Sequence, residues 1–371
     1  MSRMLSLVVV ILALSGGHGL AAGYWLKDPA TGCTVWSATT TPGETVTWSG
    51  ACVNGKANGA GTLQWARDNR PAERYEGTVV DGRMQGRGVM TWPNGDRYEG
   101  DFRNHRRTGR GTYVWGPGTS WRGNRYTGDF VDGRLNGSGT YIWANGDRYT
   151  GAYRNGKRHG RGTFIWAKGG RYEGDYRNGR RTGQGIESWP NGDRYEGGFR
   201  DGKRHGRGVF TWADGGRYEG DYRNGRRTGQ GVETWPSGNR YEGAFRNGKR
   251  HGFGVFTWAN GSRYEGDYRD GRRDGRGTMT WTNGDRYTGD FKAGRRTGQG
   301  TYRWNRGPWA GDSYTGGFID GRLHGTGTYT YANGDRYRGG YRRGKRFGRG
   351  VFIYADGRRA AMWDGVIVKE E

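Results

Sequence analysis

The chain has 371 residues and a formal net charge of +25, and only about an eighth of it is Leu, Ile, Val or Phe. Such a basic, aliphatic-poor composition excludes a large aliphatic core and, taken alone, indicates disorder. Aromatic residues nevertheless make up 14% of the chain, and they recur at a fixed period. The period predicts a repeat array, because stacked repeats share an aromatic core that no single repeat could bury.

The N-terminus is typical of a secretory signal peptide covering residues 1–22. A basic residue, Arg3, precedes an apolar run over residues 5–14, and the small residues Ala21 and Ala22 suit cleavage. The run is too short to span a bilayer. We therefore expect an exported protein, in the periplasm or outside the cell, either in solution or peripheral on a membrane surface.

Residues 23–56 are expected to form a hairpin that caps the N-terminal end of the array. They contain both cysteines of the chain, Cys33 and Cys52. Alignment on the repeat pattern places the two cysteines at facing positions of adjacent strands, and an oxidising compartment favours a disulfide between them. Such a cross-link would protect the first edge strand of the array.

Each repeat is marked by a tyrosine that is followed two residues later by glycine. Most successive tyrosines are 23 residues apart, and two intervals are lengthened to 28 and 27 residues. The marker tyrosines are Tyr75, Tyr98, Tyr126, Tyr149, Tyr172, Tyr195, Tyr218, Tyr241, Tyr264, Tyr287, Tyr314 and Tyr337. We expect about 12 clear copies over residues 57–357, followed by a C-terminal cap over residues 358–371.

The repeat over residues 155–178 illustrates the expected fold. Glycine-rich turns separate two short aromatic runs, which is typical of a β-hairpin. Side chains alternate between the faces of a strand, so Tyr172, Gly174 and Tyr176 share one face, which Trp166 of the neighbouring strand joins. Gly174 would leave room for a ring from a neighbouring strand. The sequence predicts an all-β fold: an elongated, twisted, single-layer antiparallel meander of stacked hairpins.

The same residues resemble a known repeat family. Over about residues 46–357, Tyr-Glu-Gly-Asp-Tyr is followed by Asn-Gly-Lys-Arg-His-Gly-Arg-Gly, a strand ending in Trp, and Asn-Gly-Asp-Arg. This pattern is similar to the MORN repeat (membrane occupation and recognition nexus). The resemblance implies a sheet of stacked hairpins used for scaffolding, self-association or contact with acidic membrane lipids. Where such repeats accompany an enzyme, the catalytic domain is a separate segment, and none is expected within this sequence.

Basic residues recur after the Asn-Gly turns, in segments that we expect to be loops on one side of the sheet. A ridge of positive charge there would attract acidic membrane lipids or anionic glycans. The candidate anion-binding residues are Lys157, Arg158, Arg161, Arg180, Arg181, Lys203, Arg204, Arg207, Arg226, Arg227, Lys249, Arg250, Arg272 and Arg273. The alternative is that this charge only keeps a long sheet soluble. Nucleic acid is disfavoured as a partner, because we expect an exported chain whose aromatic residues pack in the core.

No catalytic site, metal site or cofactor is predicted. His159, His205 and His251 recur 46 residues apart, which separates them by about 19 Å at the usual strand spacing, too far for a shared metal. Carboxylates such as Glu173 and Asp175 recur beside arginine, which is typical of a salt-linked polar face rather than of a hydrolase.

Two lengthened turns each add a tryptophan. Trp121 lies in the turn over residues 115–124, and Trp309 lies in the turn over residues 304–312. Tryptophan in a loop is enriched in interfaces, so both are candidate partner contacts. The alternative is that a surface turn simply tolerates an insertion.

The sequence thus predicts a non-enzymatic, exported scaffold or adaptor that binds acidic lipid headgroups or anionic envelope glycans through its basic segments. The alternative is a structural module that self-associates as a homo-oligomer, or binds another protein, without binding lipid. Salt separates the two, because electrostatic binding weakens as the Debye length shrinks.

Overall fold

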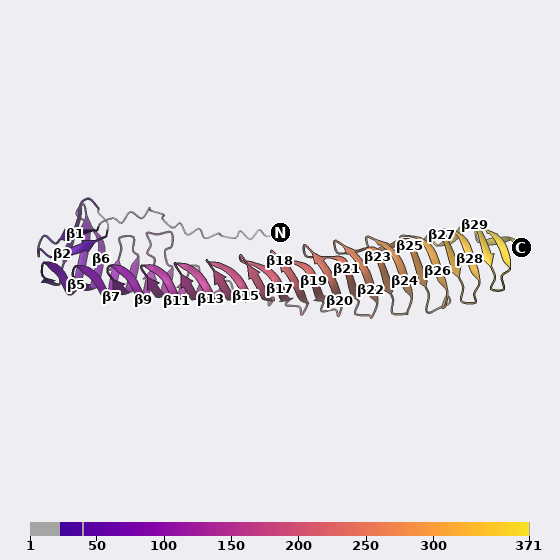
Figure 1. Ribbon diagram of the computed structural model, residues 1–371, viewed down its shortest axis with the longest axis horizontal. Helices are drawn as coiled ribbons and strands as arrows, with labels where there is room; N and C mark the ends of the chain where they lie inside the picture. Colours follow the sequence, from indigo (N-terminus) through magenta and orange to yellow (C-terminus); the bar gives the residue numbers. More distant parts are fainter. Residues whose placement is uncertain (1–22, 39–40, 371) are drawn as a thin grey trace. The chain divides into compact units, whose positions relative to one another are not determined.

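The computed structural model describes residues 23–38 and 41–370, and the predicted signal peptide lies outside these residues. The described residues form 31 β-strands and no helix, which confirms the predicted all-β class. The chain divides into two compact units, one ending at Lys157 and one beginning at Arg158. From β5 to β12 in the first unit, and throughout the second unit, strands that are consecutive in the chain lie side by side (Figure 1).

The first unit contains the N-terminal strands and the first hairpins of the array. Its strands are β1 (Tyr24–Lys27), β2 (Thr34–Ser37), β3 (Glu44–Trp48), β4 (Ala51–Val53), β5 (Lys56–Arg67), β6 (Arg70–Val80), β7 (Arg83–Thr91), β8 (Arg97–Arg103), β9 (Arg106–Val114), β10 (Arg125–Val131), β11 (Arg134–Ile142) and β12 (Arg148–Arg154). From β5 to β12 each strand pairs antiparallel with the next.

The second unit continues the same pattern to the C-terminus. Its strands are β13 (Lys157–Ile165), β14 (Arg171–Arg177), β15 (Arg180–Ser188), β16 (Arg194–Arg200), β17 (Lys203–Thr211), β18 (Arg217–Arg223), β19 (Arg226–Thr234), β20 (Arg240–Arg246), β21 (Lys249–Thr257), β22 (Arg263–Arg269), β23 (Arg272–Thr280), β24 (Arg286–Lys292), β25 (Arg295–Arg303), β26 (Ser313–Ile319), β27 (Arg322–Thr330), β28 (Arg336–Arg342), β29 (Lys345–Ile353), β30 (Arg359–Trp363) and β31 (Val366–Glu370). Each pairs antiparallel with the next, which confirms the predicted meander.

The N-terminal cap contains the predicted disulfide, but its strands are arranged differently from a simple hairpin. Cys33 and Cys52 are joined. Cys33 immediately precedes β2 and Cys52 lies in β4, and these two strands pair with β5 rather than with each other. The expectation of facing positions on adjacent strands was therefore wrong, because β1 to β4 do not follow the register of the later repeats.

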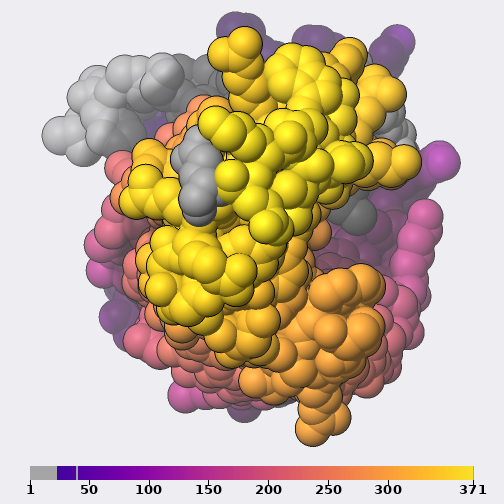
Figure 2. Space-filling view, turned by 90° about the vertical axis from the view of Figure 1, so that its right-hand side faces the viewer, coloured from indigo at the N-terminus to yellow at the C-terminus, as the bar shows by residue number. Residues whose placement is uncertain are grey.

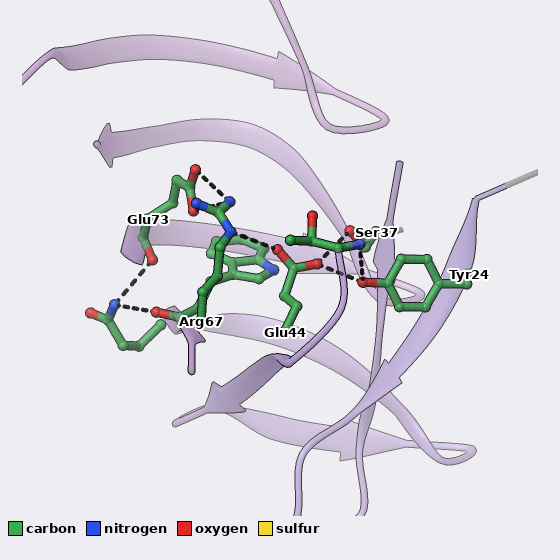
Figure 3. Close-up of polar contacts among 8 residues, drawn as sticks. Tyr24, Ser37, Glu44, Arg67 and Glu73 are labelled. Carbon is green, nitrogen blue, oxygen red and sulfur yellow. Dashed lines mark hydrogen bonds and ion pairs between the residues drawn. The ribbon is translucent and has the colours of Figure 1, made fainter. Parts of the chain in front are cut away.

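A cluster of polar side chains joins three strands of the cap to the first two strands of the array (Figure 3). The hydroxyl groups of Tyr24 and Ser37 donate to the Glu44 carboxylate at 2.7 and 3.2 Å. Arg67 lies 3.5 Å from Glu44 and 2.7 Å from Glu73. Because these residues come from β1, β2, β3, β5 and β6, the cluster fixes the first strands against the start of the array.

A two-residue turn connects the strands of each hairpin at one edge of the sheet. Asn178 and Gly179 have φ values of 50° and 85°, so both occupy the left-handed region, as a type I′ turn requires. Further along the hairpin a bulge shifts the register between Gly174 and Asp175. There the Asp175 carboxylate accepts the N–H of Gln184 at 3.1 Å.

The core lies on one face of the sheet and is built by the marker tyrosines, all of which are fully buried. A Cβ atom at Gly174 would meet Tyr172 Oη at 2.5 Å and Gly185 Cα at 2.6 Å. The ring that covers Gly174 therefore comes from its own strand, and the expectation of a ring from a neighbouring strand was wrong. The cause is geometric, since residues i and i+2 of a strand share a face.

The marker tyrosines make edge-to-face contacts along this face with tyrosine or phenylalanine rings of the same and of neighbouring repeats. Tyr218 lies 5.4 Å from Tyr222 and 5.1 Å from Phe245, measured between ring centroids. The same contacts recur from repeat to repeat, for example between Tyr241 and Phe245. Such edge-to-face pairs stabilise by about 0.5–1.5 kcal/mol beyond burial, so neighbouring repeats are coupled through their rings.

The opposite face of the sheet is polar and salt-linked, as predicted. Arg171 and Glu173 lie 2.6 Å apart, and Arg217 and Glu219 lie 2.7 Å apart. Both members of each pair are partly exposed, so each pair contributes at most about 1 kcal/mol. This face therefore adds solubility more than stability.

The C-terminal strands of the second unit lie at its surface, as the end-on view of Figure 2 shows. Among the described strands β31 pairs with β30 alone. Its Val366 and Val368 side chains are 66% and 64% exposed. This strand is an edge that offers both backbone groups and apolar side chains to solvent.

Candidate functional site

The predicted anion-binding residues do not lie in loops. Each begins or continues a strand, because the turn that precedes it contains only two residues. The expectation of basic loops was therefore wrong. The strand positions divide the predicted residues into three groups with different surroundings.

The first group, called here the stacked arginines, consists of the second residue after each turn. Its predicted members are Arg158, Arg181, Arg204, Arg227, Arg250 and Arg273. These guanidinium groups lie over core rings, as Arg250 does 5.2 Å from the Phe256 centroid. Several also donate to the glycine carbonyl of the next turn, as Arg181 does to Gly202 at 3.1 Å. The stacked arginines therefore serve packing within the sheet.

The second group lies on the polar face. Arg161 is 3.7 Å from Glu173, and Arg207 is 3.5 Å from Glu219. These arginines extend the salt-linked face and lie in the strand interior, away from the turns.

The third group is exposed at the turns. It consists of the first residue after each turn: Lys157, Arg180, Lys203, Arg226, Lys249 and Arg272. Each of the last five faces a second basic residue across its turn, at the end of the preceding strand. The facing pairs are Arg177 with Arg180, Arg200 with Lys203, Arg223 with Arg226, Arg246 with Lys249, and Arg269 with Arg272. We call these turns and their flanking basic residues the basic edge.

Sequence reasoning missed the basic residues that precede the turns, such as Arg177 and Arg223. The two-residue turn was the signal that could have found them, because it places the residues on either side directly opposite each other. Like charges at directly opposite positions destabilise a sheet. Their recurrence at five successive turns makes these pairs the candidate contact positions of the basic edge.

A hollow of about 380 Å³ lies at the basic edge between two consecutive turns. Arg177, Arg180 and Arg200 line it, together with Asp201. Asp201 lies 3.6 Å from Arg180 and is exposed, so it offsets only part of this positive charge. In this hollow more than one arginine could donate hydrogen bonds to the same oxygen-rich anion.

The opposite edge of the sheet, called here the clasp edge, carries the longer turns that follow each tryptophan. Asp285 in one such turn accepts the N–H of Asn305 and the hydroxyl of Tyr302, both at 2.8 Å. Burial raises the pKa of Asp285, but these hydrogen bonds outweigh burial and hold the pKa below its ordinary value. Asp193 likewise accepts the N–H of Ala213 at 2.9 Å. Carboxylates at the clasp edge therefore join consecutive repeats.

The tryptophans lie beside this edge. Trp166 is half-buried, with its ring 4.9 Å from that of Phe164. Trp121 and Trp309, in the two lengthened turns, are 42% and 56% exposed. The backbone of the first lengthened turn packs back onto the preceding turn, where Gly118 donates to the Asn94 carbonyl at 2.9 Å. Both indoles remain available for contact.

A comparison with known families identifies the repeats. The model of the MORN repeat matches thirteen segments, at residues 50–70, 75–97, 98–120, 126–148, 149–171, 172–194, 195–217, 218–240, 241–263, 264–286, 287–308, 314–336 and 337–358. The chain belongs to the MORN-repeat family. As a MORN-repeat protein, the chain is a repeat scaffold or binding module.

Searches for whole-chain relatives add little to this assignment. No curated protein matches the chain significantly. Similar solved structures include the TCP domain of Drosophila melanogaster SAS-4 with a proline-rich motif of Ana2, at 11% identity and a TM-score of 0.28, covering 42% of this chain and 84% of that one. The Danio rerio CPAP TCP10 domain with a STIL peptide has 12% identity and a TM-score of 0.24, covering 81% and 99%. These TM-scores are too low to carry a functional argument.

The described residues contain neither a metal-binding cluster nor a membrane-spanning helix. No cluster of three His, Cys, Asp or Glu side chains there could hold a metal ion. None of these residues forms a helix of the length and hydropathy needed to cross a membrane.

Proposed function

We propose that this MORN-repeat protein is an exported scaffold or adaptor that binds acidic lipid headgroups through its basic edge. The observation that carries the proposal is the recurrence of facing basic pairs, such as Arg177 with Arg180, at successive turns. Each basic residue near an acidic membrane contributes about 1 kcal/mol at moderate salt. A row of pairs therefore gives binding that no single turn could provide.

Anionic glycans share this chemistry, since they also present carboxylate, sulfate or phosphate oxygens. The hollow lined by Arg177, Arg180 and Arg200 accepts such a group from either source. The lipid and the glycan are distinguished by offering vesicles and a soluble acidic polysaccharide in separate arms of one experiment.

Export is supported by the chain's cysteine chemistry. The Cys33–Cys52 disulfide joins the cap strands, and structural disulfides persist mainly in oxidising compartments such as the periplasm and the cell exterior. We propose that residues 1–22 direct the chain there and that the protein is peripheral on a membrane surface.

We also propose that the protein is not an enzyme. The recurrent carboxylates, such as Glu173 and Glu219, are each engaged by arginine. Those at the clasp edge, such as Asp285, accept hydrogen bonds from the next repeat. These carboxylates have structural partners, which suits a binding scaffold.

A second function, protein binding or self-association, is favoured by a different observation. The indoles of Trp121 and Trp309 are exposed in lengthened turns, and β31 exposes Val366 and Val368 at a sheet edge. Both kinds of surface suit protein contacts. This association would depend on apolar contact and backbone pairing, and it would therefore persist at high salt.

Co-sedimentation of residues 23–371 with vesicles tests the proposal. Phosphatidylcholine vesicles, alone or mixed with phosphatidylglycerol, are offered at about 50 mM and about 500 mM salt. We expect binding to the acidic vesicles alone, and its loss at high salt. Light scattering without vesicles follows the oligomeric state. No binding to acidic vesicles together with salt-resistant oligomers would overturn the lipid proposal in favour of self-association.

A further inference from the structure

From Arg158 to Arg296, each stacked arginine contacts the residue six positions later on the aromatic face. Where that residue is aromatic, the guanidinium lies over its ring, at 5.2 Å for Arg204 over Phe210 and 5.0 Å for Arg296 over Tyr302. Where it is glutamate, the two form an ion pair, as Arg227 does with Glu233. The chain thus gives these arginines either a π face or a carboxylate.

Arg273 departs from this pattern. The residue six positions later is Met279, whose Sδ lies 3.7 Å from the Arg273 Nη1 atom. A thioether is a weak acceptor and carries no charge. The other terminal nitrogen, Nη2, donates to the Gly294 carbonyl at 2.8 Å. The Arg273 guanidinium still lies over the rings of Trp258, Tyr264 and Phe291, at 5.8, 5.4 and 5.4 Å from their centroids. Position 279, however, offers its Nη1 atom neither the ring nor the carboxylate that the other repeats place there.

The surroundings of Met279 also lack the ring that other repeats place there. Phe256 lies between Trp235 and Trp258, at centroid distances of 5.5 and 4.6 Å. In the same way Tyr302 lies between Trp281 and Trp304, at 5.4 and 4.6 Å.

Met279 occupies the equivalent place between Trp258 and Trp281. A hollow of about 260 Å³ lies there, lined by both indoles, Met279, Arg273 and Phe291. Two indoles thus border this hollow, as two indoles border the rings of Phe256 and Tyr302.

The charge at this hollow favours an anion. Burial lowers the pKa of Arg273, Tyr268 and Tyr264 partly oppose this, and the neighbouring Arg296 and Arg250 lower it further. Asp320 also lines the hollow, but Arg295 holds it at 2.9 Å. A half-buried cation without a carboxylate partner is stabilised strongly when an anion reaches it.

We propose that this hollow binds a small aromatic carboxylate, with the ring against Trp258 and Trp281 and the carboxylate on Arg273. The ring lies beside Met279, which occupies the place that Phe256 and Tyr302 fill in the neighbouring repeats. The carboxylate takes the place that Glu233 fills beside Arg227. The hollow also reaches the turn residues Gly294, Arg295 and Gly321, at the same edge of the sheet as the basic pairs, but the proposal does not depend on lipid binding.

Titration of residues 23–371 with benzoate tests the site by calorimetry. Benzamide keeps the ring without the charge, and cyclohexanecarboxylate keeps the charge without the flat ring. We expect benzoate to bind at one site and each of the other two probes to bind at least about tenfold more weakly, since a charge-assisted hydrogen bond or an aromatic stack is lost.

Substitutions at one residue complete the test. Met279→Phe supplies the ring and Met279→Glu supplies the carboxylate from the chain itself, so both are expected to abolish benzoate binding while vesicle binding is retained. Met279→Leu keeps the slot open and is expected to bind benzoate within about threefold of wild type. The proposal is overturned if wild type does not bind millimolar benzoate, or if either Met279→Phe or Met279→Glu binds it as wild type does.

Discussion

Charged residues have different partners at the two edges of the sheet. At the clasp edge, carboxylates such as Asp285 and Asp193 each accept a backbone N–H from the following repeat. At the basic edge, two-residue turns bring like charges such as Arg223 and Arg226 directly opposite each other. The clasp-edge carboxylates join consecutive repeats. At the basic edge, each facing like-charge pair slightly destabilises the pairing of its two strands.

In a chain of nearly identical repeats, this difference helps to distinguish residues that stabilise the fold from residues that could bind a ligand. The core tyrosines recur in every copy, whereas the basic pair is absent where Val80 faces Arg83 and where Val131 faces Arg134. The clasp-edge carboxylates accept hydrogen bonds from the next repeat, whereas facing like charges disfavour pairing of their strands. A surface that is kept at an energetic cost is the one where a ligand is expected.

The largest effect on the free energy of unfolding is expected at the glycines that lie under the tyrosine rings, midway between the two edges of the sheet. A Cβ atom at Gly220 would meet Tyr218 Oη at 2.5 Å and the Gln230 oxygen at 2.6 Å. Gly220→Ala should therefore lower the free energy of unfolding by at least about 3 kcal/mol, measured by urea unfolding with tryptophan fluorescence.

The control for this substitution lies at the basic edge. Gly225 has no atom near its Cβ position but has a φ of +83°, so Gly225→Ala should lower the free energy of unfolding by only about 1–2 kcal/mol. Equal effects of the two substitutions would contradict the assignment of the core.

The second effect tests the clasp edge directly. Asp285→Ala leaves the N–H of Asn305 and the hydroxyl of Tyr302 without their acceptor. The free energy of unfolding should fall by about 2–4 kcal/mol. The matched control is Asp201→Asn at the basic edge, which should change it by less than about 0.5 kcal/mol.

The Asp285 effect should also depend on pH. Its pKa is lower in the folded than in the unfolded state, so its contribution is complete above the ordinary carboxyl pKa and is lost as pH falls through the folded value. Wild type and Asp285→Ala should therefore converge in stability in acid. A constant difference down to acid pH would show that the carboxylate charge is not involved.

A smaller effect is expected at the Asn104-His105 turn, where histidine replaces the usual glycine. His105 has a φ of 66°, so His105→Gly should raise the free energy of unfolding by about 1 kcal/mol. Urea unfolding at neutral pH measures the gain.

His105 also adds a pH dependence. Burial, with a smaller effect of Arg83, lowers the pKa of its imidazole from 6.5 to about 4. Because only the unfolded state binds this proton between those values, stability should fall as pH decreases from 6.5 to about 4 and then level off. His105→Gly should remove that slope, and an unchanged slope would exclude the imidazole as its source.

The smallest effect on stability is expected from the basic edge itself. Replacing Arg177, Arg180, Arg223 and Arg226 with glutamine removes two like-charge pairs. The free energy of unfolding should stay the same or rise by less than about 1 kcal/mol, as urea unfolding at low salt will measure. A marked loss of stability would mean that these arginines hold the fold.

The sequence predicted the fold well because the repeat fixes it. The Tyr-x-Gly pattern and the Asn-Gly turns were sufficient to predict paired antiparallel strands and the tyrosine face. The contacts across strands could not be predicted in the same way. Tyr172 covers the glycine of its own strand, and the bulge after Gly174 brings Arg181 opposite Tyr176. Both depend on the register of two strands, which the pattern of one strand does not give.

The candidate site was predicted only in part for the same reason. The basic character of the turns is visible in the sequence, but the facing of Arg177 and Arg180 follows from turn geometry. In the sequence the stacked arginines resemble surface residues, and only the structure shows that they lie over the aromatic rings of the core. The slot beside Met279 depends on which side chain fills a gap between two indoles, which needs coordinates.

The most direct test of the basic edge compares two variants that lose the same charge. One carries glutamine at Arg177, Arg180, Arg223 and Arg226. The control carries glutamine at four exposed arginines that begin strands at the clasp edge, namely Arg125, Arg148, Arg286 and Arg336. Affinity for acidic vesicles is measured by co-sedimentation at low salt. The basic-edge variant should bind up to about a thousandfold more weakly than wild type and the control within about threefold. Equal losses in both variants would contradict a localised anion-binding edge.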